Sequence, residues 1–257
     1  MNEMALPAEA PEIAATLRQF TPARVGLGRT GASQHTRDQL DFQRCHALAR
    51  DAVHAAIQPE ALAGAMREIS GGEVLNLHSA AKDRASYLQR PDLGRRLDEP
   101  SRAMLEKAQG GPFEVAVIVA DGLSALAVER HAAQVIRLLM PMIVGWRMAP
   151  LCVVEQGRVA IGDEIGAALD AELAVVLIGE RPGLSSPDSL GAYITWQPSV
   201  GRTDAERNCI SNIRVEGLGY AEAAGQLAAY LSEARRRQLT GVELKIEAGT
   251  QARLQSA

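Results

Sequence analysis

Residues 113–140 read "FEVAVIVADGLSALAVERHAAQVIRLLM", and this stretch decides the fold class. Its first part, "FEVAVIVA", is almost entirely apolar and rich in valine and isoleucine, as is typical of a strand buried on both faces. The turn "DGLS" follows, and the apolar residues of the remainder are spaced as in an amphipathic helix. A buried strand, a turn and a covering helix form the repeating unit of an α/β domain.

Similar units follow along the chain. Residues 151–171, "LCVVEQGRVAIGDEIGAALDA", again predict a strand, a turn and a helix, and "ELAVVLIGERPG" at 172–183 predicts another strand. A further strand is expected in "AYITWQ" at 192–197, and a last helix in "AEAAGQLAAYLSEARRRQL" at 221–239. We therefore predict that residues 110–257 form a Rossmann-like, mostly parallel sheet with helices on both faces.

Residues 1–109 have a different character and predict a helical region. Thr36 and Gln39 form a T-x-x-Q pattern that is typical of a capping box at a helix start. Apolar residues then recur at helical spacing. Pro91 and Pro100 are expected to separate short helices further along.

Composition excludes several classes of protein. A net charge of -4 lacks the basic footprint that nucleic-acid binding requires. The three cysteines have no C-x-x-C spacing, which predicts neither a disulfide framework nor a zinc site. There is no secretory leader pattern, and no apolar run is long enough to span a membrane. We expect the cytosol, or a compartment filled from it.

Ligands of open α/β sheets bind where parallel strands end, so the segments of interest are 121–124, 156–159 and 179–183. Within the first, Gly122 and Ser124 have the position to donate to a phosphate or an amide at a helix start, although a cap is the favoured role for Ser124. Asp163 and Glu164 resemble a catalytic carboxylate pair, but we expect them to stabilise a helix N-terminus.

The segment "GLGRTG" at 26–31 matches the G-x-G-x-x-G pattern of dinucleotide-binding loops. Its context argues against that function on three counts. No clear strand precedes it, the following helix begins only near Thr36, and the nearest acidic candidate, Asp51, falls within that helix. The alternative is a turning loop whose glycines permit close approach of another chain.

Several long segments of the sequence resemble the small subunit of ethanolamine ammonia-lyase. These segments are "TPARVGLGRTGASQHTRDQLDFQRCHALARDAVH" at 21–54, "VADGLSALA" at 119–127, "GRVAIGDEIG" at 157–166, "VVLIGERPGLSSPDSLGAYITW" at 175–196 and "DAERNCISNIR" at 204–214. The resemblance implies a chain that closes over adenosylcobalamin at the interface with a large catalytic subunit. It implies an enzyme that converts ethanolamine to acetaldehyde and ammonia by a radical mechanism, active only as the complex.

The resemblance also implies three cofactor-binding residues, namely Val159, Glu180 and Cys209. From the residues alone, a packing role is favoured for Val159. Glu180 is a ligand candidate at a strand end, and its alternatives are a solvated carboxylate or a partner of Arg181. Cys209, placed in a loop-rich segment before the last helix, reads equally as a small buried hydrophobe. We predict no catalytic residue and no metal ligand in this chain.

The histidines bear on how cobalamin would be held. None of the five stands in the D-x-H-x-x-G pattern with which some proteins displace the lower base of cobalamin. This agrees with the base-on mode that the resemblance implies, in which cobalamin keeps its own benzimidazole.

The resemblance further implies a hetero-oligomer with equal numbers of both chains, partner binding by residues 1–109, and a place in the cytosol or inside a bacterial microcompartment. The glycine loop is then expected to lie against the large subunit, with Arg24 and Arg29 as interface cations. The segment "PEIAATLRQF" at 11–20 fits a targeting peptide, a first helix or a partner contact. A nucleotide-dependent oxidoreductase and an assembly protein without a ligand remain the alternative functions.

Overall fold

A six-stranded sheet forms the centre of the computed structural model, which describes residues 9–21, 23–108 and 110–246. The strand order is β3-β5-β4-β6-β7-β8. Strands β3, β5, β4 and β6 are parallel, whereas β7 is antiparallel to β6 and to β8. The strands are β3 (Val74–His78), β4 (Phe113–Ala120), β5 (Leu151–Glu155), β6 (Ala171–Gly179), β7 (Leu190–Trp196) and β8 (Arg207–Ile213). The predicted α/β fold with a mostly parallel sheet is confirmed.

Strand β4 is buried on both faces, which explains its continuous apolar run. Val115, Val117 and Val119 enter one hydrophobic core, and the alternate residues Ala116 and Ile118 enter another. Successive side chains of a strand point to opposite faces, so each face must be covered.

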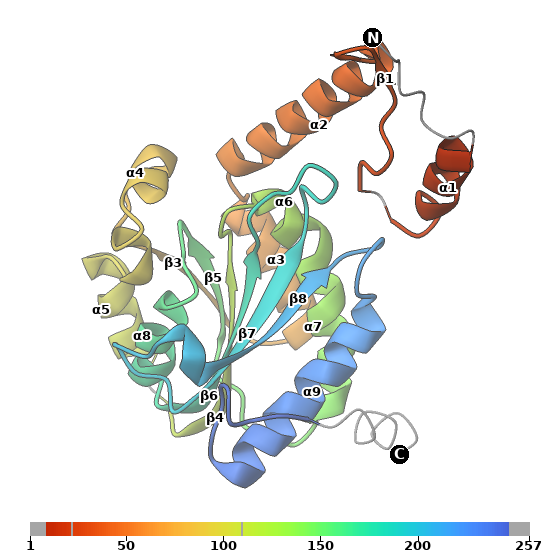
Figure 1. Cartoon of the computed structure of the whole chain (residues 1–257). Helices are drawn as coiled ribbons and strands as arrows, with labels where there is room; N and C mark the ends of the chain where they lie inside the picture. Colours follow the sequence, from red (N-terminus) through yellow and green to blue (C-terminus); the bar gives the residue numbers. More distant parts are fainter. Residues whose placement is uncertain (1–8, 22, 109, 247–257) are drawn as a thin grey trace.

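Helices cover both faces of the sheet (Figure 1). The first core includes residues of α3 (Pro59–Ser70), α6 (Ala125–Ala127), the π-helical turn η2 (Val128–Ala132), α7 (Ala133–Leu139) and α9 (Tyr220–Arg237). The second core includes residues of α5 (Glu99–Lys107) and α8 (Ile161–Ala168). Helix α8 packs against β4 and β6. On the same face of the sheet, part of β7 and β8 remains open. Exposed Cys209 lies on this open part, opposite Tyr193.

The region before residue 110 is mainly helical, as predicted, and it also contributes one strand to the six-stranded sheet. Residues 74–78 form β3, which pairs in parallel with β5 at the edge of the sheet. Helices α4 (Arg84–Gln89) and α5, with the 3-10 turn η1 (Leu93–Arg95), follow as expected. Pro100, however, stands in the first turn of α5, because a proline at that point loses no helical hydrogen bond.

An arm built from α1 (Glu9–Leu17) and α2 (Thr36–His54) projects from the sheet (Figure 1). Between the two helices, β1 (Arg29–Thr30) and β2 (Ser33–Gln34) pair as a small antiparallel hairpin. Helix α2 begins at Thr36 as predicted, but the capping-box interpretation is wrong. The N-cap is His35 and has no side-chain cap hydrogen bond, so the pattern was shifted by one position relative to the cap.

A buried ion pair fixes β8 to α8. Both oxygens of Asp163 accept hydrogen bonds from the Arg207 guanidinium, at 2.6 and 2.7 Å. Both side chains are only 2% exposed. Glu164 instead accepts from the Arg102 Nε atom at 2.6 Å and the Leu97 amide at 2.9 Å. Asp163 and Glu164 do lie in the first turn of α8 as expected, and they also tie that helix to its neighbours.

Candidate functional site

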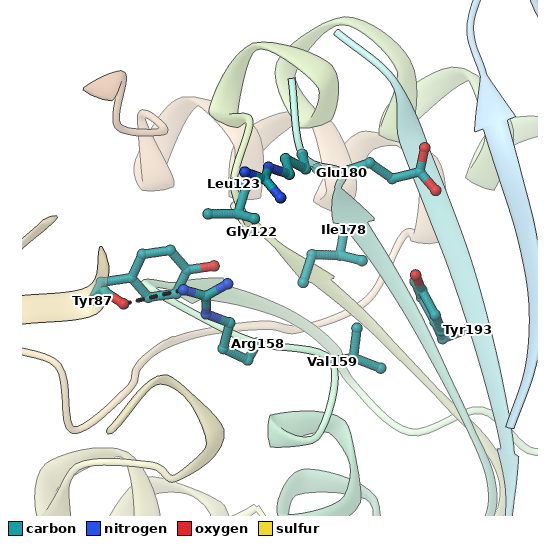
Figure 2. A pocket seen from close by; sticks show the side chains of 10 residues that line it. Tyr87, Gly122, Leu123, Arg158, Val159, Ile178, Glu180 and Tyr193 are labelled. Carbon is teal, nitrogen blue, oxygen red and sulfur yellow. Dashed lines mark hydrogen bonds between the residues drawn. The ribbon is translucent and has the colours of Figure 1, made fainter. Parts of the chain in front are cut away.

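The three segments that the sequence singled out meet at the carboxyl edge of the parallel strands. They surround an open cavity of about 450 Å³ (Figure 2). The lining residues are Tyr87, Gly122, Leu123, Arg158, Val159, Ile178, Gly179, Glu180, Arg181 and Tyr193. The cavity therefore lies at the position where open α/β sheets bind their ligands.

Two glycines allow the ends of β4 and β6 to come together at this cavity. Gly122 has a φ of 59°, and a Cβ atom there would collide with the Gly179 carbonyl oxygen. That oxygen accepts a hydrogen bond from the Leu123 amide at 2.9 Å. Ser124 caps α6, as predicted, by accepting from the Ala127 amide at 3.3 Å. Its hydroxyl donates to the Pro187 carbonyl at 2.8 Å, so the serine also holds the loop after β6.

Beneath the cavity, a buried carboxylate organises the neighbouring loops. Asp121 is fully buried and accepts a hydrogen bond from the Gly157 amide at 3.0 Å. The Arg84 Nη1 atom lies 3.5 Å from its other oxygen. Burial raises the pKa of Asp121 to about 6, although hydrogen bonds from Gln156 and the charge of Arg84 act in the opposite direction.

The Tyr87 ring contacts two guanidinium groups. The Arg84 and Arg158 Cζ atoms are 4.7 and 4.1 Å from its ring centroid, within the range of cation–π interactions. Its hydroxyl donates to the Gly157 carbonyl at 3.1 Å, and burial raises the pKa of this phenol. Arg158 Nη2 in turn donates to the Tyr87 carbonyl at 3.2 Å (Figure 2). Arg158 is thereby held at the cavity wall.

Asp121→Asn should change how stability depends on pH. The folded pKa of Asp121, near 6, exceeds the unfolded value of about 3.9, so the native state binds the proton more tightly. This group therefore favours folding at low pH, and its contribution is lost as pH rises from about 4 to 6. Relative to wild type, the asparagine variant should gain on the order of 2 kcal/mol of unfolding free energy between pH 4.5 and 7.5.

Urea denaturation across that pH range tests the prediction. Asp92→Asn is the matched control, because its exposed carboxylate is bonded to Arg90 and its pKa is lowered by that bond. Its stabilising contribution is therefore already present throughout the window. If the difference in unfolding free energy between wild type and Asp121→Asn does not change with pH, the raised pKa of Asp121 is contradicted.

Val159 and Glu180, two of the three predicted site residues, line the cavity. Val159 also packs against the second core, so its packing role and its place at the cavity coexist. The Glu180 carboxylate accepts hydrogen bonds from the Ser189 hydroxyl and, at 3.3 Å, from the Asn212 amide. Ser189 and Asn212 thus orient Glu180. Within the described part of the chain, Glu180 forms no ion pair with Arg181.

Cys209 lies in strand β8 and not in a loop, which corrects the expected local structure. Cys209 is exposed and does not line the cavity. It pairs in register with Tyr193, which is a lining residue. Desolvation by its neighbours raises the pKa of the thiol, while the Tyr193 hydroxyl acts to lower it. Cys209 therefore lies on the open sheet face beside the cavity as a poorly ionised thiol.

Sequence reasoning named neither Tyr87 nor Tyr193 at this site, and it included Arg158 only as part of the segment 156–159. Arg158 directly precedes Val159 in "GRVAIGDEIG", so adjacency alone could have suggested it. Tyr193 is in the predicted strand at 192–197, on the same face as the cavity. Tyr87 belongs to α4 and comes to the cavity only through tertiary packing, for which the sequence carries no local signal.

The glycine loop lies outside the sheet domain and forms part of the arm. Gly26 packs against Ala14 of α1, and the Arg18 side chain donates to the carbonyls of Val25 and Gly26 at 3.0 and 2.9 Å. Arg24 pairs with Asp41 at 3.0 Å, whereas Arg29 is exposed in the hairpin. The loop is not placed between a sheet strand and a helix, as a dinucleotide fingerprint requires.

Within residues 9–21, 23–108 and 110–246, which the structure describes, no group of three or more histidine, cysteine, aspartate or glutamate side chains is arranged to hold a metal ion. Nor is any described helix both long and apolar enough to cross a bilayer.

The fold and the cavity define an α/β chain with an open cavity at the carboxyl edge of a Rossmann-like sheet. A family model described as "Ethanolamine ammonia-lyase light chain (EutC)" matches residues 11–245. The chain belongs to this family.

Curated relatives agree with this assignment. The ethanolamine ammonia-lyase small subunit of Pseudomonas aeruginosa is 57% identical, over 98% of this chain and 94% of its own length. That of Ralstonia nicotianae is 58% identical, over 89% of this chain and 86% of its own length. The small subunit of Pseudomonas syringae pv. tomato is 56% identical, over 90% and 82%. The resemblance of the sequence segments to the small subunit of ethanolamine ammonia-lyase is therefore confirmed.

Proposed function

We propose that this chain is the small subunit of an adenosylcobalamin-dependent ethanolamine ammonia-lyase and closes the cobalamin site against a large catalytic subunit. The observation that carries the proposal is the cavity at the carboxyl edge of the sheet. Val159 and Glu180 come from two distant segments of the sequence, and both line this cavity. Cys209 lies on the adjoining open face of the sheet.

The chemistry of the cavity suits a corrin. A corrin is a broad apolar ring with amide groups around its edge. Leu123, Val159 and Ile178 offer apolar surface, while the Glu180 carboxylate and the Arg158 guanidinium offer an acceptor and donors. The cavity of about 450 Å³ is open and smaller than cobalamin, so a second chain is needed to cover the rest of the cofactor.

The residues of this chain bind and position the cofactor in this proposal. Glu180, held by Ser189 and Asn212, accepts a hydrogen bond from a corrin amide. Val159 contacts the ring, and Cys209 gives a small contact at its edge. When bound, adenosylcobalamin supplies radical chemistry through homolysis of its cobalt–carbon bond. The large subunit holds ethanolamine, and the small subunit excludes water from the cofactor face.

The base-on state is supported by the residues around the cavity. Among the described residues that line it, none is a histidine. The sequence also has no histidine in the D-x-H-x-x-G pattern. We propose that the cofactor therefore keeps its own benzimidazole.

The projecting arm supports a partner-binding role for the N-terminal region. Several large apolar side chains are exposed on it, namely Ile13, Leu17, Phe20, Leu40, Phe42 and Leu48. An exposed apolar group of this kind marks an interaction surface in soluble proteins. We propose that the arm and the glycine loop contact the large subunit, with Arg29 as an interface cation and Arg24 already engaged by Asp41.

Assembly and placement complete the proposal. We propose equal numbers of both chains, in the cytosol or inside a bacterial microcompartment. The segment at 11–20, which fits a targeting peptide, lies within the described residues. Helix α1 begins at Glu9, so most of "PEIAATLRQF" is helical, in keeping with either a targeting or a partner-binding role.

Co-expression with the candidate large subunit tests the function directly. We expect a stable complex that produces acetaldehyde from ethanolamine only when adenosylcobalamin is added. Each chain alone should be inactive. Undiminished activity of the large subunit without this chain would overturn the proposal, and binding of NAD by the isolated chain would favour the oxidoreductase alternative.

A further inference from the structure

A second and larger groove adjoins the cavity. Its volume is about 610 Å³, and it shares Arg158 and Val159 with the cavity. Five arginines line it, namely Arg95, Arg96, Arg158, Arg202 and Arg207. Three aspartates also line it, so the groove carries more positive than negative side chains.

Only some of these arginines have a carboxylate partner. Arg202 pairs with Glu206 at 2.5 Å, and Arg207 pairs with buried Asp163. Within the described parts of the chain, no carboxylate lies within 4.0 Å of a guanidinium nitrogen of Arg95, Arg96 or Arg158. Three guanidinium charges therefore remain available to an anion in this groove.

Two buried donors of the groove also lack a hydrogen bond. The Nε atoms of Arg158 and Arg207 are buried and have no hydrogen-bond partner among the described residues, although a carboxylate oxygen of exposed Asp204 lies 3.6 Å from Arg207 Nε. The Arg207 side chain is 2% exposed, so its guanidinium is fixed in place. A buried donor without an acceptor is costly, and a bound acceptor would remove that cost.

The loop before α5 is built to bring Arg95 and Arg96 beside Arg158. The Arg158 amide donates to the Gly94 carbonyl at 2.7 Å. A Cβ atom at Gly94 would lie 2.8 Å from the Arg158 Cγ atom and 3.0 Å from the Tyr87 ring. Only glycine permits this close approach, which places the two exposed arginines at the rim of the groove.

We propose that this groove binds the phosphodiester of the nucleotide tail of base-on cobalamin, an inference that rests on the proposed function. A phosphodiester carries one negative charge and oxygen acceptors that match guanidinium donors. The groove is continuous with the cavity that receives the corrin, so one molecule reaches both. Arg95, Arg96 and Arg158 hold the phosphate, and the corrin lies against Val159.

Binding of two corrinoids to the complex of both subunits tests this site. Cyanocobalamin contains the phosphodiester, whereas dicyanocobinamide lacks the whole nucleotide tail. The double variant Arg95→Gln with Arg96→Gln should raise the Kd for cyanocobalamin about ten-fold and leave that for dicyanocobinamide within about two-fold. Inorganic phosphate should weaken the binding of cyanocobalamin and not that of dicyanocobinamide.

Two further variants sharpen the test. Arg137→Gln removes an exposed positive charge from α7, on the other face of the sheet, and should leave both affinities unchanged. Asp204→Asn removes a 98% exposed carboxylate from the groove and should tighten cyanocobalamin binding about two- to three-fold.

The outcomes separate the two proposals. If the complex binds neither corrinoid, the proposed function fails. If both corrinoids bind and the arginine variants weaken both equally or neither, the phosphate site is wrong. If these variants instead prevent assembly of the complex, the groove receives the large subunit, and the phosphate proposal is likewise overturned.

Discussion

Replacing Asp163 by alanine should lower the free energy of unfolding by roughly 3–5 kcal/mol. The substitution leaves the Arg207 guanidinium buried at 2% exposure without its bidentate partner. Arg207 would keep hydrogen bonds to the Thr195 hydroxyl and the Arg202 carbonyl, but neither neutralises its charge. Asp204, 3.6 Å away and 98% exposed, is too strongly solvated to replace Asp163.

Urea denaturation of the full chain measures this effect. Asp92→Ala breaks an exposed pair with Arg90 and should cost less than about 1 kcal/mol, which makes it the matched control. The combined replacement Asp163→Leu with Arg207→Met should recover most of the loss, since it removes both buried charges. A cost for Asp163→Ala no larger than that of the control would show that the pair is not structurally important.

Cys209→Trp should weaken cobalamin binding to the complex by about 10- to 100-fold, as an overpacked contact does. Cys209 lies beside Tyr193 on the open face of β8, so an indole there extends toward the cavity. Because the residue is exposed on an edge strand, the fold should tolerate the change. Circular dichroism and thermal unfolding of the chain confirm that point before affinity is measured.

Glu180→Gln provides the comparison at the same site. Glutamine keeps an acceptor for the corrin amide and loses only the charge, so the affinity should fall less than about ten-fold. Leu138→Trp on α7 is the control for bulk, since that residue is 37% exposed on an opposite-face helix. If Cys209→Trp leaves the affinity unchanged, the cofactor does not lie on this face of the sheet.

Strands buried on both faces were predictable, and edge strands were not. The continuous apolar run of β4 indicates burial without reference to any neighbour. The sequence of β8, "RNCISNI", has no such run, because part of its buried surface is polar. Asn208 exchanges hydrogen bonds with the backbone of Gly241 and donates to the Leu244 carbonyl, contacts that depend on a distant segment.

The candidate site divides in the same way. The predicted strand ends gave the position of the cavity. Strands that alternate with helices in the sequence form parallel sheets, and the carboxyl ends of parallel strands share one edge of the sheet. The family resemblance then selected Val159 and Glu180. Tyr87 and Arg84, by contrast, contribute through stacking and a buried charge. Contacts of this kind join residues far apart in sequence, and no local pattern marks them.

The edge position of β3 has a consequence for synthesis on the ribosome. Among the described strands, β3 pairs in the sheet with β5 alone, and β5 ends at Glu155. Residues 74–78 are therefore made long before the strand on which they dock, and they must remain unpaired while β4 and β5 emerge. We expect nascent chains stalled shortly after Gly111 to stay sensitive to protease, and protection to begin only once β5 has left the exit tunnel.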